Sequence, residues 1–115
     1  HPSIDWLGAS PDGLLSKNGL VEFKCPTSKT HFTYQVNGVV PDQYKPQMIL
    51  QMLCTGRAWC DFVSFDPRVK PAHQLFVVRF EPTQAERDAV EAAAIKFLDE
   101  ADALFTRINQ LQEAA

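Results

Sequence analysis

The Asn18-Gly19 pair constrains the fold of this chain more than any other short segment. It lies between two apolar arms, Leu14-Leu15 and residues 20–24, and Asn-Gly between such arms is a strong signal for a β-hairpin. Successive side chains of a strand point to opposite faces, so alternate residues of the second arm share one face. On this arm, the shared face carries Leu20, Glu22 and Lys24.

Beyond the hairpin, the pattern of apolar residues predicts a helix followed by two strands. Asp42 is a suitable N-cap for a helix that runs to about Cys54, and Gly56 is placed to end it. Segments 58–66 and 74–81 are rich in Val and Phe, which favour strands. The preceding segment, residues 27–41, is compatible with either a short helix or an extended stretch.

The C-terminal third of the chain predicts one long amphipathic helix. Thr83 and Glu86 have the spacing of a capping box, which marks a helix N-terminus. From Val90 to Leu111, apolar residues recur at spacings of three and four, which gives a helix of about 40 Å if it is unbroken. The whole order of elements predicts an α/β domain with a mixed sheet.

Length and composition favour a globular chain with one core. With 115 residues and 45% apolar content, we expect one domain over residues 1–115, with a radius of gyration of about 13 Å. We expect Trp6 and Trp59 in that core, with residues 4–9 as a strand-like run. Because the chain opens on His1-Pro2 without a Met, we expect it to be the C-terminal part of a longer protein whose N-terminal segment is missing.

Net charge and cysteine content bound the possible partners and compartment. A net charge of −3 argues against tight nucleic-acid binding through phosphate neutralisation alone. No apolar run approaches the length of a membrane span, so we expect no membrane partner. Three cysteines without C-x-x-C spacing favour a reducing compartment over a disulfide framework.

The candidate chemistry lies on the predicted hairpin, at Asp12, Glu22 and Lys24. Asp12 follows a turn before the first arm and Glu22 lies on the returning arm, so the hairpin brings them near each other. Mg²⁺ prefers oxygen ligands and commonly takes one or two carboxylates. An ammonium group beside them can position a water and stabilise charge on a phosphate. Metal-assisted phosphodiester hydrolysis requires such a set.

Weaker interpretations of the same residues stay open at this point. An E-x-K triplet alone arises by chance roughly 0.4 times in a chain of this length, so it can be a plain surface charge pair. Cys25 with His31 could form a thiolate–imidazole pair, although no orienting group is identified. The histidines and cysteines do not have zinc spacing.

A longer pattern is more specific than the triplet. It comprises Gly8 to Leu14, Gly19 to Pro26, Tyr44-x-x-Gln47, Thr55, Ala58-Trp59 and Phe65-Asp66-Pro67-Arg68. In this order, the pattern resembles the phage lambda exonuclease group, the YqaJ-like viral recombinases of the PD-(D/E)XK nuclease superfamily. The resemblance implies a restriction-endonuclease-like fold, with a mixed β-sheet flanked by helices and a long C-terminal helix.

The resemblance also implies roles for individual residues. Asp12 and Glu22 would bind Mg²⁺, or Mn²⁺ as a substitute, together with the backbone carbonyl of Phe23. Lys24 would assist the attacking water, and Gln47 matches a glutamine that the family places beside the site. On a helix, Tyr44, Gln47 and Gln51 would share one face. Residues expected near DNA are Ser10, Lys29, His31, Tyr44, Gln51 and Arg57.

The implied activity is a Mg²⁺-dependent exonuclease that degrades linear double-stranded DNA from the 5′ end in phage-type recombination. The alternatives are a structure-specific or restriction-type endonuclease, and a non-catalytic module that binds DNA ends or a partner protein. Expected partners are duplex DNA ends, a single-strand annealing protein and further copies of the chain in a trimer. We expect a cytoplasmic location in a bacterium or a phage-infected host. Because the family has an upstream acidic residue that would precede His1, we expect this chain by itself to lack part of the site.

Overall fold

A four-stranded mixed sheet organises the chain, in the order β1-β2-β3-β4. The computed structural model describes residues 1–115. The predicted hairpin is confirmed: β1 (Gly13–Leu15) pairs antiparallel with β2 (Gly19–Lys24), and Leu15 lies opposite Gly19. β3 (Trp59–Phe65) runs parallel to β2, and β4 (Leu75–Phe80) runs antiparallel to β3.

Gly19 has a different role in the hairpin from the one that the Asn-Gly pair suggests. The residue with a left-handed backbone in the turn is Ser16, with φ 50°, while Gly19 already belongs to β2. A Cβ at Gly19 would come within 2.1 Å of the Trp59 ring on β3. The glycine is therefore required by the close packing of β2 against Trp59.

The connection from β2 to β3 contains two helices, which settles the ambiguous segment as helical. α1 (Ser28–Asn37) ends at Gly38, with φ 66°. A short 3₁₀ turn at Asp42–Tyr44 leads into α2 (Lys45–Thr55), which ends at Gly56 as predicted, with φ 71°. Glycine suits both stops because the left-handed region is accessible to it without a steric penalty.

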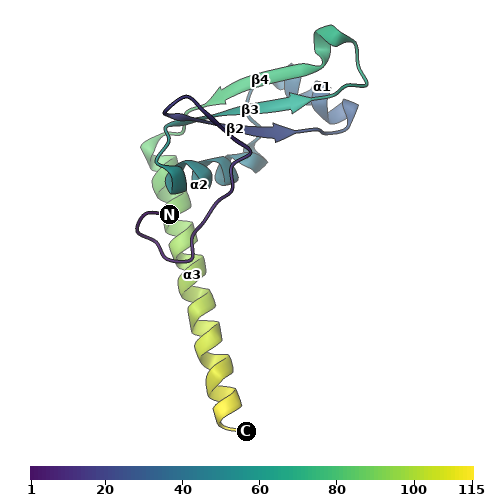
Figure 1. Cartoon of the computed structure of the whole chain (residues 1–115). Coiled ribbons are helices and arrows are strands. Elements are labelled where there is room, and N and C mark those ends of the chain that lie inside the picture. Colours follow the sequence, from purple (N-terminus) through teal and green to yellow (C-terminus); the bar gives the residue numbers. More distant parts are fainter.

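The core lies between one face of the sheet and the helices α1 and α2. Its fully buried side chains include Leu20 on β2, Phe62 on β3, and Met48 and Met52 on α2. Burying one such side chain contributes about 1.5–3 kcal/mol. Figure 1 shows α2 beneath the sheet. The opposite face of the sheet is open, and large apolar side chains there are exposed, namely Phe23, Leu75 and Val77.

The predicted long helix is α3 (Gln84–Glu113), and its capping box is confirmed. The Thr83 hydroxyl accepts a hydrogen bond from the Glu86 N–H at 3.1 Å, and the Glu86 carboxylate accepts one from the Thr83 N–H at 2.8 Å. Only the beginning of α3 packs on the core, through Val90. Beyond it, the apolar stripe is exposed at Phe97, Leu104, Phe105, Ile108 and Leu111.

The expected radius of gyration of about 13 Å is therefore wrong. The observed value is 18.3 Å and the molecule measures 64 × 31 × 22 Å, because α3 runs away from the sheet (Figure 1). The relation between chain length and radius of gyration that gives about 13 Å assumes that every element packs against the others. A 30-residue helix is about 45 Å long and exceeds the body on which it starts. None of the helices is long and apolar enough to span a membrane.

The N-terminal segment corrects two further expectations. Residues 4–9 form no strand, and Trp6 is 95% exposed with φ 67° rather than buried in the core. Trp6 instead borders a hollow of about 520 Å³ against α3, together with Leu98 and Phe105. Trp59 is half-buried, and the Arg79 guanidinium lies 3.5 Å from the centre of its ring.

A buried carboxylate fixes the chain where β2 and β3 end side by side. Asp66, which follows β3, accepts hydrogen bonds on Oδ1 from the Arg68 backbone N–H at 3.0 Å and the Arg68 Nε–H at 2.8 Å. Arg68 also donates to the carbonyl of Pro26, just after β2, at 2.7 Å. Asp66 Oδ2 is buried without a hydrogen-bond partner. Ser28 and Arg68 together lower the pKa of Asp66 to about 2.

We predict that Asp66→Asn lowers the free energy of unfolding in a pH-dependent way. A depressed native pKa stabilises the fold above the ordinary aspartate pKa of 3.8, and this stabilisation is lost as the pH falls through about 2. The difference between wild type and variant should be constant from neutral pH to about pH 5, and should shrink below about pH 4. Urea unfolding at several pH values measures it.

Asp42→Asn is the matched control for this measurement. Asp42 is exposed and its pKa is lowered by the neighbouring Lys45, at 2.8 Å. Surface ion pairs contribute little, so this variant should unfold close to wild type at every pH. If Asp66→Asn and Asp42→Asn had the same free energy of unfolding at every pH, a structural role for Asp66 would be contradicted.

Candidate active site

The β1–β2 hairpin brings Asp12 and Glu22 together, as predicted. Gly13 pairs with Val21, so Asp12, one residue earlier, lies across from Glu22. Residues opposite each other in antiparallel strands have Cβ atoms about 4.5–5.5 Å apart. The Asp12 carboxylate is held there because Oδ2 accepts a hydrogen bond from the backbone N–H of Phe23 at 2.8 Å.

Glu22 is a buried carboxylate with a partner on each oxygen. Its residue is 2% exposed. Oε1 lies 3.0 Å from the Lys24 Nζ, and Oε2 accepts a hydrogen bond from the Gln51 Nε2–H at 3.1 Å. A buried charge is tolerated only when it is paired and hydrogen-bonded, and both conditions are met here.

The ammonium of Lys24 is placed between a carboxylate and an aromatic ring. Alternation along β2 puts its side chain on the face of Glu22, as predicted, and Nζ lies 4.7 Å from the centre of the Tyr44 ring. The Lys24 side chain is 27% exposed, so its charged end remains accessible from solvent. An attacking water and a phosphate could both reach it.

The glutamine that contacts the Glu22 carboxylate is Gln51, while Gln47, which the family resemblance puts beside the site, makes no hydrogen bond to it. Gln47 is exposed and lies one turn earlier on α2. Gln51 is 2% exposed, and its Oε1 is buried without a hydrogen-bond partner. Its burial also corrects the expectation that Gln51 contacts DNA directly. Because Gln47 and Gln51 are four residues apart, they lie on the same face of α2. Only the packing of α2 on the sheet decides which of them reaches Glu22 on β2.

Two further residues expected near DNA have structural roles. His31 is fully buried: its Nδ1 lies 2.7 Å from the Ser64 hydroxyl, and its Nε2 lies 2.7 Å from the His73 carbonyl oxygen. Arg57 donates from Nη1 to the carbonyls of Ser16 and Gly19, at 2.7 and 3.0 Å, and so holds the hairpin. The His31 side chain, being fully buried, does not reach a phosphate backbone, while Arg57 uses only Nη1 in these contacts.

The remaining expected residues lie at the surface. Ser10, two residues before Asp12, and Lys29, in the first turn of α1, are both exposed. Phe23 points its exposed side chain away from the carboxylates, on the open face of the sheet. Tyr44, which was expected near DNA, presents its ring to Lys24.

Cys60 and the Cys25–His31 pair offer no competing nucleophile. Burial, and then the negative charges of Glu22, Asp61 and Asp12, raise the pKa of the Cys60 thiol to about 12. It therefore stays protonated at neutral pH, and thiolate is the nucleophilic form. Cys25 is exposed, while His31 already has partners on both ring nitrogens, so they form no catalytic pair.

The donor set suits a hard divalent cation. No cluster of three or more His, Cys, Asp or Glu side chains that could hold a metal ion is present, so any ion here would rest on fewer protein carboxylates. Asp12 and Glu22 supply two neighbouring carboxylates, and the buried Gln51 amide oxygen without a partner adds a neutral oxygen nearby. Mg²⁺ is commonly held by one or two carboxylates with water completing its shell, so these residues fit it.

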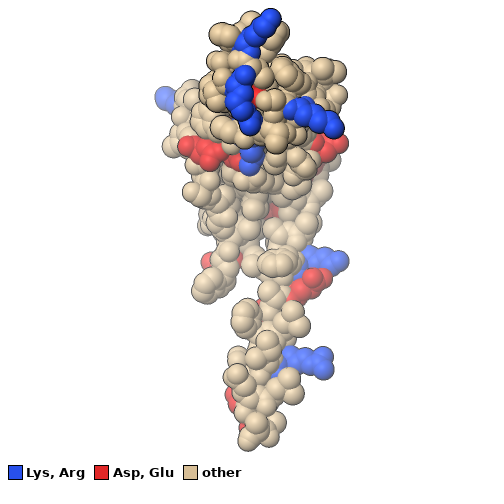
Figure 2. Space-filling view, turned by 90° about the vertical axis from the view of Figure 1, so that its right-hand side faces the viewer, with Lys and Arg blue, Asp and Glu red and all other residues tan.

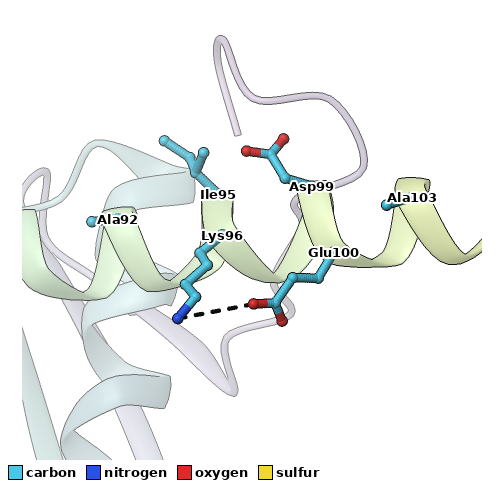
Figure 3. A pocket seen from close by; sticks show the side chains of 6 residues that line it. All are labelled: Ala92, Ile95, Lys96, Asp99, Glu100 and Ala103. Atoms are coloured by element: carbon cyan, nitrogen blue, oxygen red, sulfur yellow. Dashed lines mark ion pairs between the residues drawn. The ribbon is translucent and has the colours of Figure 1, made fainter.

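The hollows on the surface lie away from this set. The hollow in Figure 3 is a shallow depression along α3, with Lys96 and Glu100 paired at 3.9 Å on one side of the helix. Another is lined by Phe32, Gln35, Val36 and His73. Neither hollow contains a buried carboxylate paired with a lysine, so the hairpin remains the candidate site.

The comparisons with known proteins give a family and similar solved structures. Residues 1–58, which include Asp12, Glu22, Lys24 and Gln51, match the YqaJ-like viral recombinase domain. No significant match is found among curated proteins. The chain is similar to the crystal structure of an alkaline exonuclease (LHK-Exo) from Laribacter hongkongensis, with 42% identity and a TM-score of 0.92 over 96% of this chain and 57% of that one.

A second structure, LHK-Exo in complex with dAMP, matches at 40% identity and a TM-score of 0.94, covering 100% of this chain and 60% of that one. The chain thus spans less than two thirds of the length of these solved structures. The mixed sheet, the connecting helices and the long C-terminal helix are those of the exonuclease fold, and the chain belongs to the YqaJ-like viral recombinase family.

Proposed function

We propose that this chain forms the catalytic core of a Mg²⁺-dependent exonuclease that degrades linear double-stranded DNA from the 5′ end. The observation that carries the proposal is the buried Glu22 carboxylate, held between Lys24 and Gln51 and opposite Asp12. The likeness to an alkaline exonuclease over nearly the whole chain supports a nuclease. Strand polarity and the metal rest on the family resemblance and on the donor set.

In this proposal Asp12 and Glu22 hold the divalent ion, together with the carbonyl of Phe23. Mn²⁺ would substitute for Mg²⁺ because it accepts the same oxygen donors. When bound, the ion lowers the pKa of its water and stabilises charge on the phosphodiester. The protein itself orients the two carboxylates. The Phe23 N–H holds that of Asp12, and the Gln51 amide holds that of Glu22.

Lys24 supplies the positive charge that the reaction needs. Its ammonium lies 3.0 Å from Glu22, at the edge of the buried site, and is partly exposed. From there it can orient the attacking water and stabilise the charge that builds on the phosphate oxygens. Gln47, exposed on α2 one turn before Gln51, would act beside this site, a role that rests on the family resemblance.

Binding of DNA must rely on more than the charge of this chain. The net charge is −3, and on the face in Figure 2 the basic side chains are separated by neutral and acidic surface. We therefore propose that a homo-oligomer, a trimer by family resemblance, encloses the duplex end. A single-strand annealing protein would receive the strand that is left, in the cytoplasm of a bacterium or phage-infected host.

Linear and circular duplexes of one sequence test the exonuclease assignment directly. With Mg²⁺, the full-length protein should convert linear duplex into nucleotides and single strand, and should leave covalently closed circles intact. Protecting each end in turn establishes the polarity. Cleavage of circles would indicate an endonuclease instead, and no cleavage of either would indicate a non-catalytic module.

We predict that Asp12→Asn and Glu22→Gln, in the full-length protein, each lower the turnover rate by about 10³-fold or more. Asp12→Asn keeps an oxygen that can accept the Phe23 N–H. Glu22→Gln keeps one oxygen for the Lys24 ammonium, and its new amide N–H can donate to the free Gln51 Oε1 once the Gln51 amide turns over. Thermal unfolding of both variants should therefore stay close to wild type. Calorimetry should show weaker Mn²⁺ binding in each. Asp99→Asn on the exposed part of α3 is the control and should match wild type in all three measurements.

We predict that Lys24→Ala lowers kcat by about 10²-fold with little change in KM, as expected for loss of a transition-state interaction. Lys24→Arg should rescue little, because a planar guanidinium cannot replace a compact ammonium there. Single-turnover kinetics at saturating DNA and two ionic strengths measure this. Lys29→Ala, at an exposed lysine, is the control and should alter only salt-dependent binding. If Lys24→Ala, like Lys29→Ala, altered only salt-dependent binding and left the single-turnover rate unchanged, the catalytic role of Lys24 would be refuted.

A further inference from the structure

We infer that Tyr44 is a positioning residue whose ring holds the Lys24 ammonium in place beside Glu22. The inference rests on the proposed function, because it takes Lys24 as the catalytic ammonium. It assigns Tyr44 a role inside the protein, where the sequence pattern had suggested a contact with DNA.

The Lys24 ammonium has one partner on each of two sides. Nζ lies 3.0 Å from Glu22 Oε1 and 4.7 Å from the centre of the Tyr44 ring. A cation within about 6 Å of a ring centre is attracted by the negative face of the ring. A lysine side chain has four flexible carbons, so the carboxylate alone would leave the ammonium free to swing toward solvent. The ring limits that freedom.

The Tyr44 ring is itself held on the strand pair that carries the site. It stacks on Phe62, with the ring centres 5.6 Å apart and the planes inclined by 21°. Phe62 is fully buried and pairs with Glu22 in the register of β2 and β3. Glu22, Lys24, Phe62 and Tyr44 therefore form one packed unit, in which the ring cannot shift independently of the carboxylate.

The hydroxyl of Tyr44 has a second anchor on α1. Tyr34 donates a hydrogen bond to it, with the two oxygens 3.4 Å apart, and the two rings meet edge to face at 6.5 Å. Burial is the main factor that raises the pKa of Tyr34 to about 12, so its hydroxyl remains protonated and able to donate. Tyr34 also packs edge to face on Phe62 at 5.5 Å.

Helix α2 thus positions both charged groups of the site. Tyr44 immediately precedes it and contacts Lys24, while Gln51, two turns later, binds Glu22. A looser contact on the same chain offers a comparison. Lys45 lies 5.8 Å from the Phe80 ring and pairs with exposed Asp42, away from the candidate site.

Two variants separate the ring from the hydroxyl in the full-length protein. Tyr44→Phe keeps the aromatic face and should retain the wild-type single-turnover rate. Tyr44→Leu keeps an apolar side chain but loses the face, and should lower the rate roughly 3- to 30-fold with KM unchanged. Equal rates for the two variants would overturn the inference. Lys24→Ala with full activity would instead overturn the proposed function.

A second readout does not depend on catalysis. With lysines labelled at the ε-carbon, the Lys24 ε-methylene protons should resonate upfield of those of the exposed lysines, because they lie over an aromatic ring. The shift should persist in Tyr44→Phe and disappear in Tyr44→Leu. If Tyr44→Leu is unfolded by circular dichroism, the wild-type spectrum decides: a Lys24 signal among those of the exposed lysines overturns the inference.

Discussion

The buried charge of Glu22 is the constraint on which the arrangement of the site depends. A carboxylate that is 2% exposed needs a partner on each oxygen, and the chain supplies Lys24 from the same strand and Gln51 from α2. This demand fixes how α2 lies against β2. Asp12 is then added by the hairpin, where the Phe23 N–H holds its carboxylate. The residues of the candidate site therefore also take part in the packing around them.

The candidate site lies beside a packed core, whereas other surfaces of the chain are open. Phe62, Met48 and Met52 fill the space between sheet and helices, whereas the other face of the sheet and the far half of α3 leave apolar side chains exposed. The chain also spans less than two thirds of the solved exonuclease structures that it matches. The site is thus well formed in a body that is only partly covered.

Local sequence signals predicted most of the elements correctly. The hairpin, the two later strands, the stop at Gly56 and the capping box at Thr83 all depend on residues close together in the chain. Prediction failed where a residue's environment came from distant segments. Trp6 is a large aromatic residue of the kind found in cores, but no element packs over it and its side chain is exposed. The expected radius of gyration was too small because α3 extends away from the sheet.

The sequence by itself determined the chemistry: Asp12, Glu22 and Lys24 share one side of a hairpin because of turn residues and the two-residue period of a strand. Only the tertiary structure decided which other polar residues join them and which are paired elsewhere. Gln51 is 29 residues from Glu22, His31 bonds to Ser64 across 33 residues, and Arg57 bonds to Ser16 across 41. Such pairings follow from how α1, α2 and the sheet pack, because a side chain can satisfy a buried polar group only when packing brings the two together.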